Sequence, residues 1–218
     1  GIQPVMSVGE NQTMFGANTY NYPVRLAQII RPTNTEILHL VPGNLAPEHA
    51  FFRRVQGALA SVEDQYDIVV LDCPPQLGFL SMVSLAASTS ILVTIYPEML
   101  DVMSMVQSLN MTESFMASLQ ERGVDMEYNW IRYLITRYEP NDNPQAQMRS
   151  YLKSLLGGYV LDNAVLKSTA ISDAGVLQQT LYELERAHFA RGTYDRAIES
   201  MNAVHAEIET LITKVWGR

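Results

Sequence analysis

The sequence has one cysteine, no long hydrophobic run and few charged residues. Each of these features excludes some classes of protein. Cys73 cannot form an internal disulfide, which fits a reducing cytoplasm. The longest apolar stretches, 68–71 and 90–95, are far shorter than the roughly 20 residues that a membrane span needs. The first residues, 1–4, show no basic segment followed by an apolar one, as a signal peptide would. We therefore expect a cytoplasmic protein that does not insert into membranes.

Composition predicts a folded chain rather than a disordered one. Hydrophobic residues make up 47% of the 218 residues and charged residues 17%, which is typical of globular proteins. A chain of this length can bury a sizeable core in one domain. We expect residues 1–218 to form a single domain in which 1–34, rich in Asn, Gln, Pro and Gly, is irregular.

The net charge of −8 argues against a surface covered with basic residues for nucleic acid. The charges are unevenly distributed, since residues 1–129 carry 5 basic and 13 acidic side chains. Only segment 130–168 has a basic excess, with five basic residues against three acidic ones. Its basic residues are Arg132, Arg137, Arg149, Lys153 and Lys167. They form either a basic patch or an ordinary solvated helix face.

Short apolar runs alternate with segments of helical periodicity along the chain. Such an order predicts β-α-β crossovers, and hence an α/β fold with a doubly wound, mostly parallel sheet flanked by helices. The expected strands are 36–41, 66–71, 90–96, 130–138 and a short one at 159–161. The expected helices are 22–30, 47–62, 79–87, 100–121, 143–156 and 193–215, with residues 140–142 capping the fifth.

The most informative motif follows the apolar run 66–71, which places Asp72 at the carboxyl end of an expected strand. Ligands of open α/β sheets bind at that edge. A carboxylate there can hold Mg²⁺ while the metal bridges nucleotide phosphates. Pro74 and Pro75 stiffen the chain after it, and Gly78 permits a close backbone approach. The alternative is that Asp72 only caps the next helix.

This stretch resembles the Walker B and switch II region of the ParA/MinD family of deviant-Walker ATPases, whose members share an Asp-x-Pro-Pro-x-Leu-Gly pattern. Segments 96–101 and 134–138 are similar to later parts of the same family. Segments 137–142, 166–175, 194–197 and 216–218 are similar to the RepA partition proteins of repABC-type plasmids. The resemblance covers roughly residues 36–218 and implies a P-loop NTPase-like fold.

The resemblance also implies a function and a set of site residues. Family members bind ATP with Mg²⁺, form homodimers, bind DNA non-specifically at the nucleoid, and hydrolyse ATP when a ParB-type partner stimulates them. By resemblance, Asp72 is the catalytic and metal-linked residue. The other implied nucleotide-binding residues are Pro74, Pro75, Gln76, Gly78, Thr136, Arg137 and Tyr138. The last three are expected where the edge of the adenine is read, with DNA or solvent as the alternative for Arg137. The expected contacts to the DNA backbone are Arg149, Lys153 and Lys167.

The sequence departs from this family in its lysines. A P-loop needs a lysine in a glycine-rich turn to bind phosphates, and Lys153, Lys167 and Lys214 are the only lysines. None of them follows a glycine. The protein is a truncated form, a degenerate homologue or an incomplete sequence, and we expect the isolated chain not to hydrolyse ATP. The alternative function is a non-enzymatic interaction or co-repressor module that keeps the fold without nucleotide hydrolysis.

Overall fold

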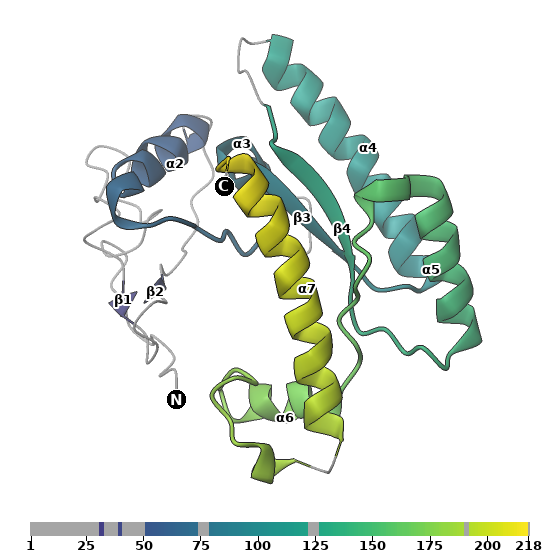
Figure 1. Ribbon diagram of the computed structural model, residues 1–218. Coiled ribbons are helices and arrows are strands. Elements are labelled where there is room, and N and C mark those ends of the chain that lie inside the picture. The colour runs from purple at the N-terminus through teal and green to yellow at the C-terminus, as the bar shows by residue number, and fades with distance from the viewer. Residues whose placement is uncertain are drawn as a thin grey trace. The chain divides into compact units, whose positions relative to one another are not determined.

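The computed structural model describes residues 31–32, 39–40, 51–73, 79–121, 127–189 and 192–217 (Figure 1). The chain divides into two compact units, Gly1–Ser88 and Thr89–Arg218, and each is described by itself. The expected irregularity of 1–34 and the expected helix 22–30 lie almost wholly outside the described residues. The single-domain organisation of residues 1–218 stays a prediction.

The first unit is organised around two helices that pack on each other. Val55, Val62 and Val83 are buried there, and the Gln56 side-chain amide donates a hydrogen bond of 2.7 Å to the carbonyl of Ala86. The elements of this unit are β1 (Arg31–Pro32), β2 (His39–Leu40), α2 (Phe51–Ala60), the 3-10 helix η3 (Glu63–Gln65) and α3 (Phe79–Ala87). The two short strands pair antiparallel, and α2 and α3 confirm two of the predicted helices.

The expected strand at 66–71 does not form a ladder with any described residue, so this prediction is wrong for the structure. The segment runs without regular structure, and the side chains of Ile68, Val69 and Val70 are exposed, that of Val70 by 83%. An apolar run becomes a strand only when neighbouring strands satisfy its N–H and C=O groups. The periodicity of the sequence reports the apolar character of this run but not the presence of such a neighbour.

The second unit is built on two parallel strands in register, β3 (Ser90–Ile95) and β4 (Trp130–Ile135). Residues 160–167 run along the other edge of β4, with parallel bridges from Tyr133 to Val160 and from Tyr138 to Leu166. Backbone hydrogen bonds join this third segment to β4, among them one of 2.9 Å from Val165 N–H to the carbonyl of Ile135. The predicted parallel α/β sheet is thereby confirmed. The expected strand 159–161 is reduced to the bridge at Val160, after the 3-10 helix η4 (Gly157–Tyr159).

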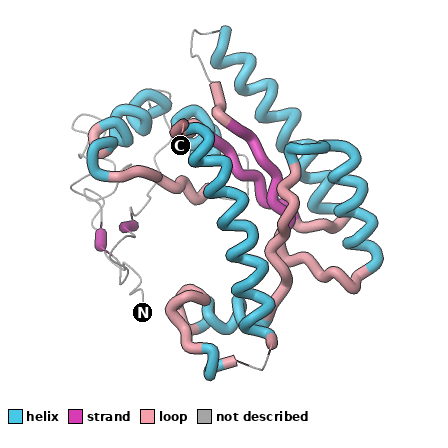
Figure 2. Tube along the Cα trace, in the orientation of Figure 1, coloured by secondary structure: helices cyan, strands magenta, loops and turns pink. Residues whose placement is uncertain are grey.

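Alternation along β3 and β4 creates two hydrophobic layers. Val93, Ile95, Tyr133 and Ile135 contribute to a core cluster with α4 (Met99–Glu121) and α5 (Asn143–Leu156). Leu92 and Leu134 contribute to a second cluster with Val204, Ile208 and Leu211 of α7 (Thr193–Val215). Figures 1 and 2 show α7 on one side of the strands and α4 with α5 on the other. Because successive side chains of a strand point to opposite faces, these six-residue strands bury both faces.

Polar caps start the helices on which the second unit depends. The Asp142 carboxylate accepts a hydrogen bond from the backbone N–H of Gln145 at the start of α5, which confirms that residues 140–142 supply a cap. Ser168 caps α6 (Thr169–Val176) through its hydroxyl oxygen, which accepts from the N–H of Ala170. A further short element, η5 (Arg186–His188), precedes α7. Ala170 of α6, Leu181 and Ala197 of α7 form a third buried cluster.

One carboxylate fastens the 160–167 segment to α7. Glu207 accepts hydrogen bonds from the backbone N–H of Asp162 at 2.7 Å and from that of Asn163 at 2.9 Å, and a third from the Asn163 side-chain amide at 2.9 Å. Two of these donors are main-chain groups that have no backbone acceptor among the described residues. The segment therefore holds its course beside β4 partly through a side chain of the last helix.

The core of the second unit should depend on Leu152, which is 0% exposed in the α4–α5 layer. We expect Leu152→Ala to lower the free energy of unfolding by about 2–5 kcal/mol, because it removes buried methyl groups and leaves a cavity. Leu155→Ala is the matched control on the same helix, since Leu155 is 56% exposed, and it should change stability within about 0.5 kcal/mol. Urea unfolding measures both, and equal effects would contradict the assigned layer.

The Glu207 contact predicts a second stability effect. Glu207→Ala leaves two backbone donors without their acceptor, which should cost about 1–3 kcal/mol and increase amide hydrogen exchange at Asp162 and Asn163. Glu209→Ala, one half-turn further along α7 and exposed, is the control. Hydrogen exchange followed by mass spectrometry distinguishes the two variants. Unchanged exchange in Glu207→Ala would show that the contact does not hold the segment.

Candidate functional site

Polar residues gather where β3 and β4 end. Tyr96 and Glu98 follow β3, and Thr136, Arg137 and Glu139 follow β4. Thr136 extends the ladder by one residue, because its N–H donates to the carbonyl of Ile95 at 2.8 Å and its hydroxyl donates to the same oxygen at 3.3 Å. Since the carboxyl ends of parallel strands meet at one edge of a sheet, the two loops lie side by side there.

Arg137 takes an unusual backbone conformation at this edge. Its φ of 53° lies in the left-handed region, which non-glycine residues adopt uncommonly. Its guanidinium carbon lies 4.5 Å from the centroid of the Tyr96 ring, within the range of a cation–π contact. This contact joins the two loops through side chains. Local strain of this kind is found preferentially at ligand sites.

Gln145 joins the same two loops from the start of α5. The residue is 3% exposed, its side-chain oxygen accepts from the N–H of Glu139 at 2.9 Å, and its amide donates to the Tyr96 hydroxyl at 3.5 Å. Sequence reasoning missed this role. The signal was present, because Asp142 and Gln145 have the spacing of a capping box. In the structure the glutamine serves the loop before the helix instead of the cap residue.

One ion pair forms at this edge among the described residues. Lys167 donates to Glu139 across 2.7 Å, and the hydrogen bond to this carboxylate, with its charge, raises the pKa of Lys167 above its ordinary value. A hydrogen bond with Glu98 likewise raises the pKa of Tyr96. Tyr96 therefore stays a neutral donor, and the edge carries balanced charges rather than a strong field of one sign.

The three residues expected at an adenine differ in their accessibility. Thr136 is half-buried and Arg137 is exposed, whereas Tyr138 is 6% exposed and belongs to the core cluster with Leu152. The structure therefore leaves Thr136 and Arg137 as the accessible groups of this set. The nucleotide role of all three stays a prediction.

Asp72 lies in the first unit, and its side chain is exposed at the end of the irregular segment 66–73. Pro74, Pro75, Gln76 and Gly78 lie outside the described residues. In the part of the chain that the structure describes, no group of three or more His, Cys, Asp or Glu side chains is arranged to hold a metal ion. A metal at Asp72 would thus depend on water and nucleotide oxygens for its other ligands.

The predicted DNA-contacting cations fall into two places. Arg149 and Lys153, one turn apart on α5, both contact Asp162: Arg149 donates to its carbonyl at 2.7 Å and Lys153 to its carboxylate at 2.8 Å. The hydrogen bond and charge of Lys153 lower the pKa of Asp162. Lys167 instead pairs with Glu139 at the carboxyl edge. Tyr138 contacts residues of both places. Its ring lies 5.0 Å from the Arg149 guanidinium, and its carbonyl accepts a hydrogen bond from the backbone N–H of Lys167.

Comparison with known proteins agrees with this architecture. A family model described as an AAA domain matches residues 19–123. The "Putative replication protein A" of Rhizobium rhizogenes is 49% identical over 236 residues, covering 100% of this chain and 58% of the relative. A ParA family protein of Chlamydia muridarum is 21% identical, covering 81% of this chain and 71% of the relative. The chain thus spans little more than half the length of its replication-protein relative.

Solved structures give the same result for the fold. An ATP complex of a Cyanothece McdA variant superposes with a TM-score of 0.65 at 14% identity, covering 94% of this chain and 78% of that one. Pyrococcus furiosus MinD, described as a cell division ATPase, gives a TM-score of 0.55 over 86% of this chain and 72% of its own. In the described residues no helix is long and apolar enough to cross a membrane. In sequence the chain is similar to these replication and ParA family proteins, and in fold it is similar to the ParA/MinD-type ATPases.

Proposed function

We propose that the protein is a plasmid-partition ATPase that binds Mg²⁺-ATP, forms a homodimer with ATP bound, and binds DNA without sequence preference in that state. Hydrolysis would be stimulated by a ParB-type centromere-binding partner, at the nucleoid in the cytoplasm. The observation that carries the proposal is the edge where β3 and β4 end, with Thr136 and the Arg137–Tyr96 contact held by the buried Gln145. Its position fits the general location of nucleotide sites in open parallel sheets.

The residues of this chain offer contacts for the metal ion and for the adenine of a nucleotide, but not for its phosphates. Asp72 offers an exposed carboxylate of the kind that binds hydrated Mg²⁺, and Pro74, Pro75, Gln76 and Gly78 would form the switch that follows it. Thr136 and Arg137 offer donors and a flat cation for the edge of adenine, with Tyr138 buried behind them. Bound Mg²⁺ would supply charge neutralisation on the phosphates during their transfer.

The sequence of this chain contains no glycine-rich turn with a lysine that could bind the phosphates. Each of the three lysines stands outside a glycine-rich turn, and backbone amides of such a turn, with a lysine, normally bind β- and γ-phosphates. The proposal therefore requires a phosphate-binding loop beyond these 218 residues. Without it, most of the positioning and electrostatic stabilisation of phosphoryl transfer is lost.

DNA binding is proposed for the cations Arg149, Lys153 and Lys167. Lys153 and Lys167 form exposed ion pairs with Asp162 and Glu139. Exposed pairs contribute little to stability and are screened by salt, so a DNA phosphate can replace the carboxylate at small cost. Contacts of this kind give affinity without reading the base sequence.

We propose a protein-binding surface on α4 and α5. Met99, Met103 and Val106 of α4, with Met148 and Tyr151 of α5, line an apolar groove of about 340 Å³. Met99 and Met103 are each 63% exposed, and flexible methionines suit surfaces that bind other proteins. The groove is compatible with the dimer or the ParB-type partner, and it also favours the second candidate function, an interaction module without hydrolysis.

Isothermal calorimetry with Mg²⁺-ATP tests the nucleotide proposal directly. We expect no binding by the 218-residue chain, and binding by a protein extended upstream to include a P-loop, because only the extended protein can neutralise the phosphates. In the extended protein, Asp72→Asn should weaken Mg²⁺-dependent ATP binding roughly 10- to 100-fold, as loss of a group that orients a metal commonly does.

Asp67→Asn is the control for that series, since Asp67 is also exposed in the segment before Asp72. It should bind as the unmodified protein does. If the extended protein does not bind ATP, the chain keeps its fold for interactions alone and the second candidate function replaces the first.

Charge reversal tests the DNA proposal. In the extended protein with ATP, Lys153→Glu with Lys167→Glu should weaken binding to a random-sequence duplex. It should also reduce the slope of log affinity against log salt by about 2, since two phosphate contacts are lost. Arg196→Glu, an exposed cation on α7 outside segment 130–168, is the control. Fluorescence anisotropy over a salt series measures the slope, and a double mutant with unchanged affinity and slope would refute the assignment.

A further inference from the structure

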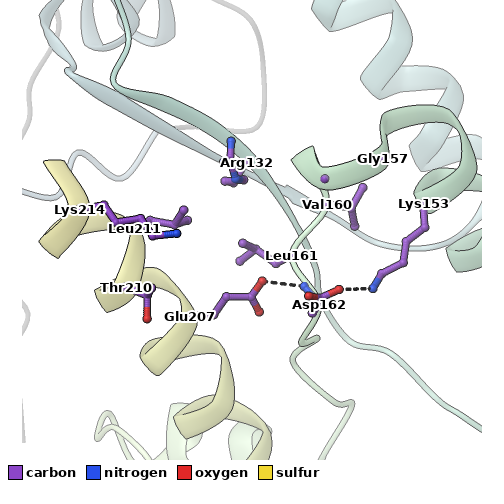
Figure 3. A pocket seen from close by; sticks show the side chains of 11 residues that line it. Arg132, Lys153, Gly157, Val160, Leu161, Asp162, Glu207, Thr210, Leu211 and Lys214 are labelled. Atoms are coloured by element: carbon purple, nitrogen blue, oxygen red, sulfur yellow. Dashed lines mark hydrogen bonds and ion pairs between the residues drawn. The ribbon is translucent and has the colours of Figure 1, made fainter.

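A second pocket lies at the other end of β4. It has a volume of about 540 Å³ and is formed within the second unit by β4, α5, the turn after α5 and the last turns of α7 (Figure 3). Arg132, near the start of β4, lines it, whereas Thr136 lies beyond the end of that strand. Four residue steps along the chain separate the two, about 13 Å at the usual rise. The pocket is therefore distinct from the nucleotide site proposed above.

Positive charge predominates among the lining residues. Arg132, Lys153 and Lys214 come from three different elements, and only Asp162 and Glu207 oppose them, for a net charge of +1. Both carboxylates are already engaged. Asp162 pairs with Lys153 at 2.8 Å, and Glu207 accepts three hydrogen bonds from residues 162 and 163. Within the described residues, neither Arg132 nor Lys214 forms an ion pair.

Of the two cations without an ion pair, Arg132 says more about the ligand that the pocket can bind. Its side chain is half-buried, and one N–H donates to the carbonyl of Ile131 at 2.8 Å while the guanidinium carbon lies 5.7 Å from the centroid of the Tyr159 ring. A guanidinium carries five N–H donors in a planar fork that matches phosphate or carboxylate. A half-buried cation without a counter-ion is costly to maintain, so an anion that enters the pocket gains most of its binding energy here.

The pocket has an open turn on one side and an apolar base. The turn between α5 and the 160–167 segment contains Gly157 and Gly158, which add no side chain to the wall, and a Cβ at either position would meet no atom within 4 Å. Val160, Leu161 and Leu211 supply an apolar base. Apolar surroundings lower the local dielectric constant and strengthen the attraction of the cations for an anion.

We propose that this pocket binds a phosphate group, held by Arg132 in a bidentate contact and by Lys214 and Lys153 as point charges. Phosphate fits better than a monocarboxylate because its tetrahedral oxygens can accept hydrogen bonds from the guanidinium and from both ammonium groups at once. A phosphate monoester carries up to two negative charges, and a DNA phosphodiester carries one. The group can belong to a small phosphate ester or to the backbone of DNA, and the chemistry of the contact is the same for both.

The test uses the 218-residue chain with two probes, inorganic pyrophosphate and a random duplex of about 20 base pairs, followed by ¹⁵N NMR. The amides of Gly157 and Gly158 report on the pocket directly.

We expect saturable shifts of both amides, and at least roughly tenfold weaker binding in Arg132→Gln and in Lys214→Gln, as loss of a charge-assisted contact of about 1.5–3 kcal/mol implies. Lys214 is exposed on the last turn of α7, so its variant tests the site without disturbing the sheet. Arg196→Gln removes an exposed cation at the other end of α7. It is the control and should bind as the unmodified chain does.

The two probes identify the source of the phosphate. Shifts with pyrophosphate that the duplex does not compete away indicate a small phosphate ester. Duplex binding that is lost in Lys214→Gln and retained in Arg196→Gln indicates the DNA backbone. If neither probe shifts Gly157 and Gly158, or if both pocket variants bind like the unmodified chain, the proposal is overturned. None of these outcomes depends on ATP, so they are independent of the calorimetric test of the nucleotide site.

Discussion

The parallel ladder between β3 and β4 is the constraint on which the second unit depends. Its six residue pairs run in register from Ser90 with Trp130 to Ile95 with Ile135. Because side chains alternate across a strand, this register sends one set of apolar residues to α4 and α5 and the other set to α7. A shift of one residue would exchange the two layers. The same register brings Tyr96 and Thr136 to one edge and places Arg132 near the other.

The two ends of β4 differ in their balance of charged side chains. At the carboxyl end, Lys167 is neutralised by Glu139, and Arg137 lies over the Tyr96 ring. At the amino end, the carboxylates of Asp162 and Glu207 are engaged by Lys153 and by backbone donors, and Arg132 keeps unused hydrogen-bonding capacity. An edge with balanced charge suits a large ligand that is recognised by shape and hydrogen bonds. An edge with surplus positive charge suits a small anion.

Much of the architecture followed from local pattern. The helices expected at 79–87, 143–156 and 193–215 have the same bounds in the structure, because apolar periodicity and a capping residue act within a few residues of chain. The strand expected at 66–71 fails for the opposite reason. Its pairing depends on a neighbour distant in sequence, and the apolar run carries no information about that neighbour. Tyr138 was expected at a ligand, and its burial in the α4–α5 layer could not be read from its motif.

The sequence alone determined the α/β class, the strands and long helices around β3 and β4, and the similarity to the ParA/MinD family, through the pattern that begins at Asp72. These features depend on local periodicity and on motif spacing, which the linear order of residues contains in full. Only the tertiary structure decided which groups meet: Gln145 with Tyr96 and Glu139, Glu207 with the 160–167 segment, and Arg132 with Lys153 and Lys214 around one pocket. Glu207 and Asn163 are 44 residues apart in sequence. Contacts over such distances form because burying both faces of the sheet leaves the chain one arrangement, and no short motif encodes that arrangement.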